Sequence, residues 1–322
     1  MTKDAKQCSA ALVAVDWGTT SFRAWLLDAA GTVLDKVRSS DGSLRVSERA
    51  NSSLERAAAF QGTLQQLCSG WLAADPGLPV LCAGMVGSNH GWMEVEYLDV
   101  PVPLTDLANH LTLVGAGGAN VRICPGLRVA GPDPDVIRGE EVQLVGALAD
   151  SPHRLETVVL PGTHSKWVRL DGLRVTDFTT AMTGELYGLL MQHSILARLA
   201  TSEAGSEASD AFVRALEVEA EHGDQRGLPF LLFTARTLVL AGRLDPADIA
   251  DYVSGLLIGA EVRHALLSNP PGLVAVCGSG STVARYRIAL ERSGATVTTI
   301  GEDVAAAGLW RIAANAGLLA SS

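Results

Sequence analysis

Short apolar runs separated by polar turn residues open the chain. Ala11–Val15, Phe22–Leu27 and Val33–Val37 are such runs, and Asp28–Gly31 forms a tight turn between the last two. This pattern predicts three strands joined as an antiparallel meander. Farther along, apolar residues recur at helical spacing over Leu54–Ala74 and predict a helix.

The rest of the chain alternates strands and helices by the same criteria, which is typical of an α/β protein. Short Val- and Ile-rich runs next to Gly-containing loops read as buried strands, and longer stretches of 3.6-residue periodicity read as helices. The predicted strands are Val80–Cys82, Val121–Ile123 and Gly272–Val276, and the predicted helices are Glu140–Ala149, Thr183–Leu199, Glu207–Glu221, Pro246–Leu267, Val283–Leu290 and Val304–Ala316.

An internal repeat organises this alternation. Gly18–Val37 aligns with Gly162–Phe178, because each segment has a GTxS loop, a strand, a Gly-containing turn and a further strand. An apolar strand also leads into each loop. Two such copies, about one domain length apart, predict two similar halves. The SPHR sequence interrupts the pattern near Ser151–Glu156, so we expect an N-terminal domain over residues 1–150 and a C-terminal domain over 151–322.

Composition narrows the class of protein. The 322 residues are 48% hydrophobic and 19% charged, as in a globular protein, and their net charge is −10. No basic stripe is present, so we do not expect nucleic acid as a partner. The five cysteines are scattered without a CxxC pair, which fits a reducing compartment. No apolar run suits a signal peptide or a membrane span, and we therefore expect a cytoplasmic protein. The cysteines are Cys8, Cys68, Cys82, Cys124 and Cys277.

The loop DWGTTS combines groups that a nucleotide phosphate with magnesium requires. Asp16 stands at the end of a buried strand, where a carboxylate can hold Mg²⁺, usually through water. Gly18 lets the backbone approach a ligand closely, and the N–H groups and hydroxyls of Thr19 and Thr20 can bind phosphate oxygens. The alternative is an ordinary hairpin turn, since Gly and Thr are common at strand ends; the repeat favours the functional interpretation.

The second loop, GTHSK, repeats the Gly-Thr start and adds cationic chemistry. Lys166 can serve as a point charge for the transferring phosphoryl group, although a single lysine is more commonly a solvated surface charge. This copy lacks the acid of the first loop, because Leu160 and Pro161 stand where Asp16 and Trp17 do. Its candidate phosphate-binding residues are Gly162, Thr163, His164 and Ser165.

A third Gly/Ser loop, CGSGS, follows the strand predicted at Gly272–Val276 and precedes a helix. A turn of this kind suits the adenosine or α-phosphate end of a nucleotide, although a GSG sequence alone also serves plain packing. The nucleotide-binding interpretation is favoured because CGSGS is the third Gly-containing loop at the end of a predicted strand. The candidate residues are Gly278, Ser279 and Gly280.

Taken together, these motifs resemble the superfamily of sugar kinases, actin and heat-shock ATPases, and within it the 2-dehydro-3-deoxygalactonokinase family. The resemblance runs over about Val13–Glu261 and is carried by DWGTTSFRAW, CAGMVGSNHGW, IRGEEVQLVGAL, LPGTHSKWV, TTAMTGELYGLLMQHSIL and YVSGLLIGAE. It implies two RNase-H-like (actin-like ATPase) domains around a central cleft. It also implies transfer of a phosphoryl group from MgATP to the 6-hydroxyl of 2-dehydro-3-deoxy-D-galactonate, in galactonate or galactose catabolism.

The resemblance also directs attention to Glu140 and Glu141 as candidates for the general base. EEVQLV is similar to the EEARLI-type segment of exopolyphosphatases, whose first glutamate lies in the active cleft, so Glu140 is the first choice and Glu141 the second. A base near the acceptor hydroxyl would take its proton late in the transfer. The alternative is a pair of acids favoured by the dipole at a helix N-terminus.

A sugar acid needs cations, amides and hydroxyls from loops at the strand ends of the N-terminal half. Alternation places Ser21 and Arg23 on one face of the second strand. Arg23 could equally be a salt-bridge partner, and Asn89 could serve a turn. The candidate sugar-acid contacts are Ser21, Arg23, Gly84, Ser88, Asn89 and Trp92.

Other functions share much of this sequence signature. A kinase for another small sugar or sugar acid fits the same loops. An exopolyphosphatase-like phosphohydrolase would share Glu140, but we would expect more cationic residues for a polyanion. A non-catalytic sensor would usually carry an appended DNA-binding segment, for which 322 residues leave no room. The expected partner is a small-molecule substrate, and a homodimer is left open.

Overall fold

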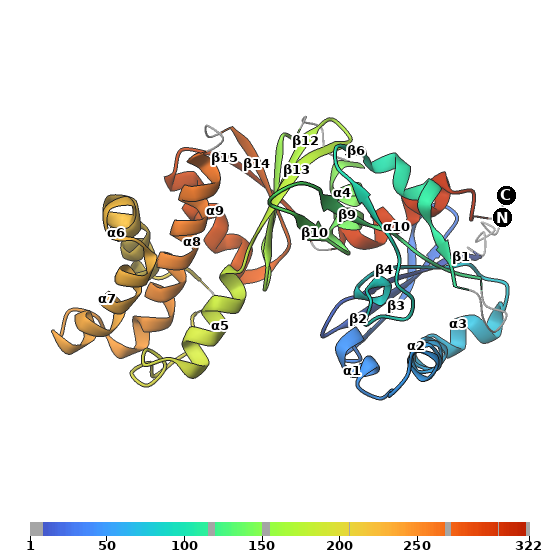
Figure 1. Cartoon of the computed structure of the whole chain (residues 1–322), viewed down its shortest axis with the longest axis horizontal. Helices are drawn as coiled ribbons and strands as arrows, with labels where there is room; N and C mark the ends of the chain where they lie inside the picture. The colour runs from blue at the N-terminus through green and yellow to red at the C-terminus, as the bar shows by residue number, and fades with distance from the viewer. Residues whose placement is uncertain are drawn as a thin grey trace, which may run out of the picture. The chain divides into compact units, whose positions relative to one another are not determined.

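The structure is a computed structural model of the chain, and it divides into two compact units (Figure 1). Unit 1 consists of Met1–Pro152, Leu173–Asp177 and Asp303–Ser322, and unit 2 of His153–Gly172 and Phe178–Glu302. The chain thus changes unit near the expected boundary at 150, but returns to unit 1 twice. The structure describes residues 9–114, 120–149, 155–205, 207–267, 272–301 and 303–319. Cys8 and most of the expected boundary segment lie outside them.

The main sheet of unit 1 has the strand order β3-β2-β1-β4-β8-β7. β1, β2 and β3 pair antiparallel, which confirms the predicted meander, whereas β1, β4 and β8 run parallel. β1 lies in the middle of the sheet, where both of its faces are covered, and its burial is nearly continuous for that reason. The strands are β1 (Ala10–Trp17), β2 (Phe22–Asp28), β3 (Val33–Ser39), β4 (Val80–Gly84), β7 (Thr112–Leu113) and β8 (Val121–Ile123).

Helices cover both faces of this sheet (Figure 1). On one face, α2 (Ser53–Leu67) packs against a core that includes Trp17 and Phe60. On the other, α10 (Val304–Asn315) crosses α4 (Glu140–Ala149) at glycines: a Cβ on Gly146 would lie 1.9 Å from Val304 O. The predicted helix over 54–74 divides into α2 and α3 (Ser69–Ala74), and α1 (Ser43–Ser47) follows β3.

Several short elements of unit 1 were not predicted from the sequence. β5 (Tyr97–Asp99), β9 (Gly126–Val129) and β10 (Asp135–Ile137) form a small second sheet, and β6 (Val102–Pro103) pairs with Arg174 and Val175 at the start of β13. The 3₁₀ helices η1 (Met85–Gly87) and η2 (Leu104–His110) complete the unit. These elements are too short to show a hydrophobic period, so a pattern search misses them.

The sheet of unit 2 repeats the topology of unit 1. Its order β15-β14-β11-β12-β13 matches β8-β4-β1-β2-β3, with β11, β14 and β15 parallel and β11 antiparallel to β12. The strands are β11 (Thr157–Leu160), β12 (Ser165–Asp171), β13 (Arg174–Ala181), β14 (Leu273–Cys277) and β15 (Thr296–Ile300). The repeat read from sequence is therefore confirmed, and each unit has the RNase-H-like strand order.

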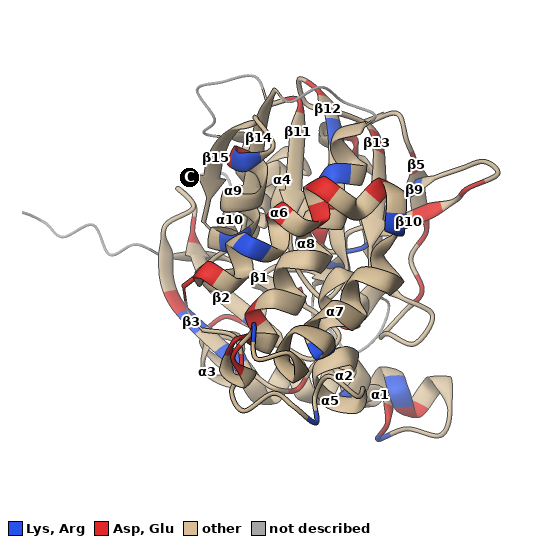
Figure 2. Cartoon of the chain, turned by 90° about the vertical axis from the view of Figure 1, so that its left-hand side faces the viewer, with Lys and Arg blue, Asp and Glu red and all other residues tan. Residues whose placement is uncertain are grey.

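In unit 2, α6, α7 and α8 pack together (Figure 1), and acidic and basic residues are interspersed on the helices that face the viewer in Figure 2. α8 is buried on nearly all sides. α7 was not among the predicted helices; its Pro229 lies in the first helical turn, where the missing N–H costs nothing. The helices are α5 (Thr183–His193), α6 (Asp210–Arg226), α7 (Leu228–Leu240), η3 (Pro246–Asp248), α8 (Ile249–Leu267) and α9 (Gly280–Arg292).

The sequence prediction for the first of these helices was too long. Ser194 donates a hydrogen bond to Leu190 O at 2.6 Å and accepts one from Leu196 N, so its side chain replaces the backbone bonds that would continue α5. The helix ends at His193 rather than at Leu199. Within the described residues, no helix has the length and apolar character needed to cross a bilayer.

Candidate active site

Asp16 and Gly84 occupy neighbouring ends of two parallel strands in unit 1. Asp16 pairs with Ala83, and Trp17 with Gly84, so both carboxyl ends reach the same sheet edge. Gly84 has φ +91°, and a Cβ there would lie 2.7 Å from Trp17 O. A Cβ on Gly139, after β10, would in turn lie 3.2 Å from Gly84 Cα. Three segments far apart in sequence therefore meet at this edge because glycines let their backbones touch.

The carboxylate of Asp16 is buried, and Arg23 is its ion-pair partner. Burial raises the pKa of Asp16, while the charge of Arg23 and its hydrogen bond act in the opposite direction. The guanidinium also lies 5.9 Å from the Trp25 ring centroid. The salt-bridge alternative for Arg23 is thus what this structure contains, and a sugar-acid contact would require Arg23 to serve both partners.

The residues Thr19–Ser21 are exposed, and a glycine supports their backbone from behind. Gly42 lies so close that a Cβ would be 2.3 Å from Thr19 O, while Leu44 N donates to the same oxygen at 3.1 Å. The loop therefore keeps its hydroxyls toward solvent, as a phosphate-binding loop requires.

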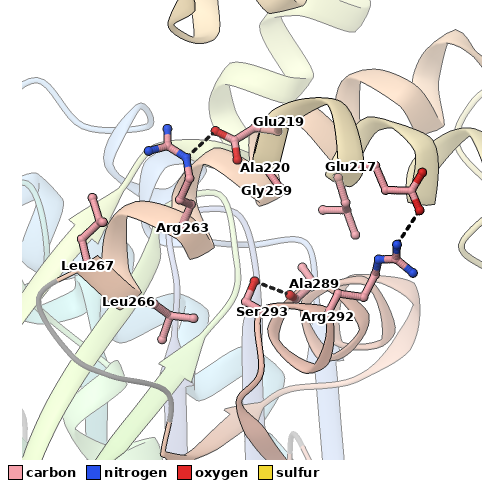
Figure 3. A pocket seen from close by; sticks show the side chains of 11 residues that line it. Glu217, Glu219, Ala220, Gly259, Arg263, Leu266, Leu267, Ala289, Arg292 and Ser293 are labelled. Atoms are coloured by element: carbon pink, nitrogen blue, oxygen red, sulfur yellow. Dashed lines mark hydrogen bonds and ion pairs between the residues drawn. The ribbon is translucent and has the colours of Figure 1, made fainter. Parts of the chain in front are cut away.

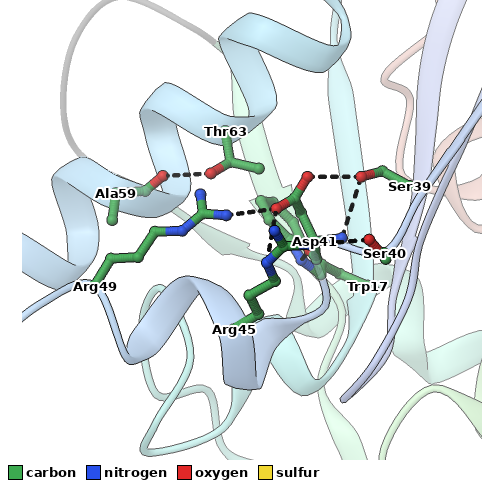
Figure 4. Close-up of polar contacts among 8 residues, drawn as sticks. All are labelled: Trp17, Ser39, Ser40, Asp41, Arg45, Arg49, Ala59 and Thr63. Carbon is green, nitrogen blue, oxygen red and sulfur yellow. Dashed lines mark hydrogen bonds and ion pairs between the residues drawn. The ribbon is translucent and has the colours of Figure 1, made fainter.

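Asp41, which precedes Gly42, holds the backbone around this glycine in place through polar contacts (Figure 4). Its carbonyl oxygen accepts from Trp17 Nε1 at 2.9 Å, and its carboxylate accepts from Ser39 Oγ at 2.6 Å and from Arg49 at 2.5 Å. The hydrogen bond from Ser39, with the charge of Arg49, lowers the pKa of Asp41. Arg45 lies 3.8 Å away. A charged cluster thus ties the turn behind the first loop to the core residue Trp17.

The two glutamates that begin α4 have different environments. Glu140 is half-buried and accepts from Arg138 N at 2.9 Å. Glu141 is fully buried; one oxygen accepts from Gly139 N at 2.6 Å, and the other has no hydrogen-bond partner among the described residues. Burial, followed by the charge of Glu140, raises the pKa of Glu141 to about 8. Only Glu140 is accessible, which favours it over Glu141 as a group that could contact a ligand.

The sugar-acid candidates divide between surface and core. Ser21 and Asn89 are exposed. Ser88 is buried, and its hydroxyl donates to Met85 O at 2.8 Å. Trp92 is only 7% exposed and packs against Trp17 and against Phe60, with ring centroids 6.4 Å apart in each pair. Trp92 is therefore a core residue that leaves little of its ring for a ligand.

The second Gly-Thr loop, in unit 2, places a buried lysine beside exposed backbone. Gly162, Thr163 and His164 are exposed, whereas Lys166 is 8% exposed. Lys166 Nζ donates to Thr180 Oγ1 at 3.1 Å, and within the described chain no carboxylate lies within 4 Å of it. Burying an ammonium group without an acid costs free energy unless an anion binds to it. Lys166 therefore has the environment expected of a residue that binds a phosphate group.

The N-terminus of α5 supports this loop as Gly42 supports the first. A Cβ on Gly184 would lie 2.2 Å from Gly162 O, and Glu185 N donates to Thr163 O at 2.9 Å. The Glu185 carboxylate also lies 2.5 Å from His164 Nε2. Sequence reasoning missed both Gly42 and Gly184, although each follows the third strand of its repeat at a similar distance.

The third loop lies at the same sheet edge as the second, because β14 runs parallel to β11 beside it. Gly278 and Gly280 have φ values of +142° and +71°, and the exposed Ser279 is the N-cap of α9. Next to the loop lies a cavity of about 750 Å³ whose lining includes Tyr187, Gln192, Thr201, Ser202, Glu203 and Ser281.

A buried ion pair holds one wall of that cavity. Arg285, on α9, pairs with Asp251 and donates to Gly205 O at 3.0 Å and to Glu207 O at 3.3 Å. The segment after Ala200 is thereby attached to α8 and α9. No sequence motif indicates this cavity, because its lining comes from four separated segments.

The metal that the first loop was expected to bind needs few protein ligands. Among the described residues, no three His, Cys, Asp or Glu side chains come together as a metal cage. Magnesium that arrives on nucleotide phosphates keeps most of its waters and needs only one or two carboxylates. Arg23 engages Oδ2 of Asp16, and Oδ1 faces Gly84 at the sheet edge. Asp16 therefore fits an ion carried by ATP rather than a resident metal.

Two RNase-H-like units, each with a supported Gly-Thr loop, define the architecture of a sugar kinase of the actin-like class. The family model described as 2-keto-3-deoxy-galactonokinase matches residues 16–312. The chain belongs to this family, and it is a kinase. The resemblance recognised from the sequence motifs is thereby confirmed.

Individual relatives agree with the family match. The chain is 37% identical to the 2-dehydro-3-deoxygalactonokinase of Escherichia coli (strain K12), over 92% of this chain and 95% of the relative. It is 38% identical to a protein of Rhizobium meliloti (strain 1021) that is named as a probable 2-dehydro-3-deoxygalactonokinase. This match covers 91% of this chain and 92% of the relative. A crystal structure from Sinorhizobium meliloti, also provisionally so named, superposes with a TM-score of 0.85 at 36% identity, covering 94% of this chain and 98% of the other.

Proposed function

We propose that this kinase transfers the γ-phosphoryl group of MgATP to the 6-hydroxyl of 2-dehydro-3-deoxy-D-galactonate. Membership of the 2-keto-3-deoxy-galactonokinase family supports the substrate. The observation that carries the phosphoryl chemistry is Lys166, a buried ammonium that has no acid partner among the residues the structure describes and lies beside an exposed Gly-Thr loop. ATP and sugar acids are cytoplasmic metabolites, so we place the reaction in the cytoplasm.

Unit 2 is the proposed ATP-binding half. The backbone of Gly162 and Thr163 would bind phosphate oxygens, and Lys166 would stabilise charge on the transferring group. The Cys277–Ser281 loop opens onto the cavity lined by Tyr187, which has the volume expected for a ligand such as adenosine. We therefore propose that this cavity holds the base and ribose, with Gly278, Ser279 and Gly280 at the α-phosphate.

Unit 1 is the proposed acceptor half. Asp16 would orient the water shell of the magnesium that ATP carries, and the Gly18–Thr20 loop would bind the phosphate oxygens. Glu140 would accept the proton of the 6-hydroxyl as its oxygen attacks phosphorus, with Glu141 as the second choice. We leave out Trp92, which is buried. The remaining candidates for contact with the sugar acid are Ser21, Arg23, Gly84, Ser88 and Asn89.

An ADP-release assay over sugar acids, neutral sugars, polyphosphate and water alone tests this function. We expect release that requires a 2-keto-3-deoxy sugar acid, with the galactonate epimer as the best acceptor. Phosphate release from polyphosphate, with no acceptor-dependent ADP, would favour the phosphohydrolase alternative. ADP release with neutral sugars alone would instead indicate a different sugar kinase.

Asp16→Asn provides the site-directed arm of that test. The amide cannot orient the hydrated magnesium as the carboxylate does, so transfer should fall below detection while the fold persists. Turnover is measured together with a thermal melt. Asp35→Asn, an exposed acid of β3 in the same unit, is the matched control and should retain full activity. Near-normal turnover of folded Asp16→Asn would contradict the role of the first loop.

A further inference from the structure

Glu261 is a buried acid within the most buried helix of unit 2. It lies on α8, among residues such as Ile258 and Val262, and is 9% exposed. Its carboxylate accepts hydrogen bonds on both oxygens: Trp167 Nε1 donates to Oε1 and Tyr286 OH to Oε2, each at 2.7 Å. The side chains of Thr183 and Ser165 also lower the pKa of this carboxyl, in opposition to its burial.

These hydrogen bonds replace the cation that a buried carboxylate usually requires. In the part of unit 2 that the structure describes, no Lys, Arg or His lies within 4 Å of the Glu261 oxygens. Burial accordingly raises the pKa of Glu261, and the surrounding polar side chains act against that shift. A buried polar network whose members are all hydrogen-bonded is rigid and holds the elements that supply it in one arrangement.

These polar side chains come from the segments that form the proposed ATP site. Ser165 ends the second Gly-Thr loop, is fully buried, and its Oγ lies 2.7 Å from Tyr286 OH. Thr183 directly precedes Gly184, which packs on Gly162. Tyr286 belongs to α9, whose first residue is Gly280 of the third loop. One carboxylate thus contacts the phosphate loop, its supporting helix and the helix that leaves the adenosine loop.

We propose that Glu261 is a positioning residue that holds the Gly162–Ser165 loop and the Cys277–Ser281 loop at a fixed separation, so that both bind one ATP molecule. The proposal rests on unit 2 being the ATP-binding half. It assigns Glu261 no contact with substrate. Its function is to keep two loops, which share no sequence neighbourhood, in the arrangement that the nucleotide requires.

Glu261→Gln is the direct test. The amide keeps the size of the side chain, but Trp167 Nε1 can only donate, so the amide oxygen must face it and the NH₂ group must face Tyr286. The Tyr286 hydroxyl then has to accept a hydrogen bond from the amide and turn its own proton toward Ser165, which reverses the hydrogen bonds to α9 and to the loop. Tyr286→Phe is the second variant, because it removes only the link to α9 and leaves the acid bonded to Trp167.

Glu219→Gln is the matched control. Glu219 is also a buried acid against α8, 2% exposed, and burial also raises its pKa. It lines a hollow of about 350 Å³ between α6, α8 and α9, where Arg263 Nε donates to it at 2.9 Å (Figure 3). None of the residues lining that hollow belongs to the three loops.

Two measurements decide the proposal. ATP affinity and kinetics should show KM for ATP raised about tenfold in Glu261→Gln and Tyr286→Phe, which corresponds to ~1.4 kcal/mol, with KM for the sugar acid changed by less than about twofold. Hydrogen exchange without nucleotide should rise at the amides of residues 162–166 and 278–283. Glu219→Gln should match their loss of thermal stability but show neither effect.

The outcomes separate this proposal from the proposed function. Unchanged exchange in both loops, or faster exchange without weaker ATP binding, would overturn the role of Glu261. If the wild-type protein binds ATP but phosphorylates no sugar acid, the proposed function fails while the affinity and exchange comparisons still hold. If the wild-type protein binds no ATP, both proposals fail together.

Discussion

In unit 1 the Gly18–Ser21 loop follows β1, whose second-last residue is Asp16. In unit 2 the Gly162–Ser165 loop follows β11, which ends at Leu160, and the buried Lys166 comes directly after the loop. Both loops are supported in the same way, by a glycine after the third strand whose Cα touches the loop backbone. The two loops therefore have the same backbone support, but the charged side chains beside them have opposite signs. The two copies of the repeat thus share one loop conformation, with the acid Asp16 beside it in one copy and the cation Lys166 beside it in the other.

The polar groups that fix each supporting glycine differ as well. Asp41, before Gly42, belongs to a half-exposed cluster with Ser39 and Arg49, and its pKa is lowered. Thr183, before Gly184, lies beside the buried Glu261, whose pKa is raised. A surface cluster is weakened by salt and by acid, whereas a buried network responds chiefly to changes in its hydrogen-bonding atoms. The supports of the two loops should thus fail under different conditions.

The largest effect expected in this comparison comes from Glu140, the candidate base in unit 1. Glu140→Gln keeps the size of the side chain but cannot accept a proton, so turnover should fall by roughly 10²–10⁴-fold. Affinity for both substrates should change little. Glu141→Gln, whose carboxyl is fully buried, is the control and should cost much less. If Glu141→Gln is the inactive variant, the two roles exchange; if both variants stay active, the base lies elsewhere.

Removing the cation of unit 2 should have the next largest effect. Lys166→Ala takes away charge that matters most in the transition state, so turnover at saturating ATP should fall by about 10²–10³-fold. KM for the sugar acid should stay close to the wild-type value. Lys36→Ala, an exposed lysine on β3, serves as the control. An unchanged rate for Lys166→Ala would remove the contrast in charge between the two loops.

The shared support is tested by two glycine substitutions. In Gly42→Ala and Gly184→Ala the new methyl group would lie 2.3 Å from Thr19 O and 2.2 Å from Gly162 O, so each should lose about 1–3 kcal/mol of stability as well as activity.

The helical glycines Gly62 and Gly70 are matched controls, because a Cβ at either meets no atom within 4 Å. Alanine at these positions should stabilise the protein by about 0.5–1 kcal/mol. Urea unfolding and kinetics would measure all four variants. If the two supporting glycines tolerate alanine as well as the controls do, the loops do not depend on close approach.

The next test concerns the pH dependence of stability. Glu141 has a folded pKa of about 8 against an ordinary value of 4.5, so the stability it contributes is present at low pH and lost as pH rises through that range. One proton corresponds to a slope of up to about 1.4 kcal/mol per pH unit. Glu141→Gln should flatten the dependence of the melting temperature on pH between 5 and 8. The exposed Glu48→Gln should leave it unchanged.

Asp41 should behave in the opposite sense. Its lowered pKa means that its contribution is present above the ordinary value near 3.8 and disappears as pH falls through it. Asp41→Asn should therefore lose stability at neutral pH but differ little from wild type in acid. A parallel pH response of the two variants would contradict the electrostatic contrast within unit 1.

Much of the fold could be predicted from local signals. The meander, the Gly-Thr repeat and the start of α4 are properties of consecutive residues, because strand alternation, turn glycines and helical periodicity all act within a few positions. The candidate loops follow from the same signals, since each is a Gly-rich turn at the end of an apolar strand. α7, which has Pro229 in its first turn, was not predicted.

What the sequence by itself determined is therefore the repeat, the class of loop and the residues that could carry charge. Only the tertiary structure decided that Trp92 lies in the core, that Glu141 is inaccessible, and that α10 returns to unit 1. It also decided that Glu261 bonds to Trp167, 94 positions away in the sequence, and to Tyr286 on α9, 25 positions away. Burial and these contacts depend on chain segments that meet only after folding, and no local pattern records which segments will meet.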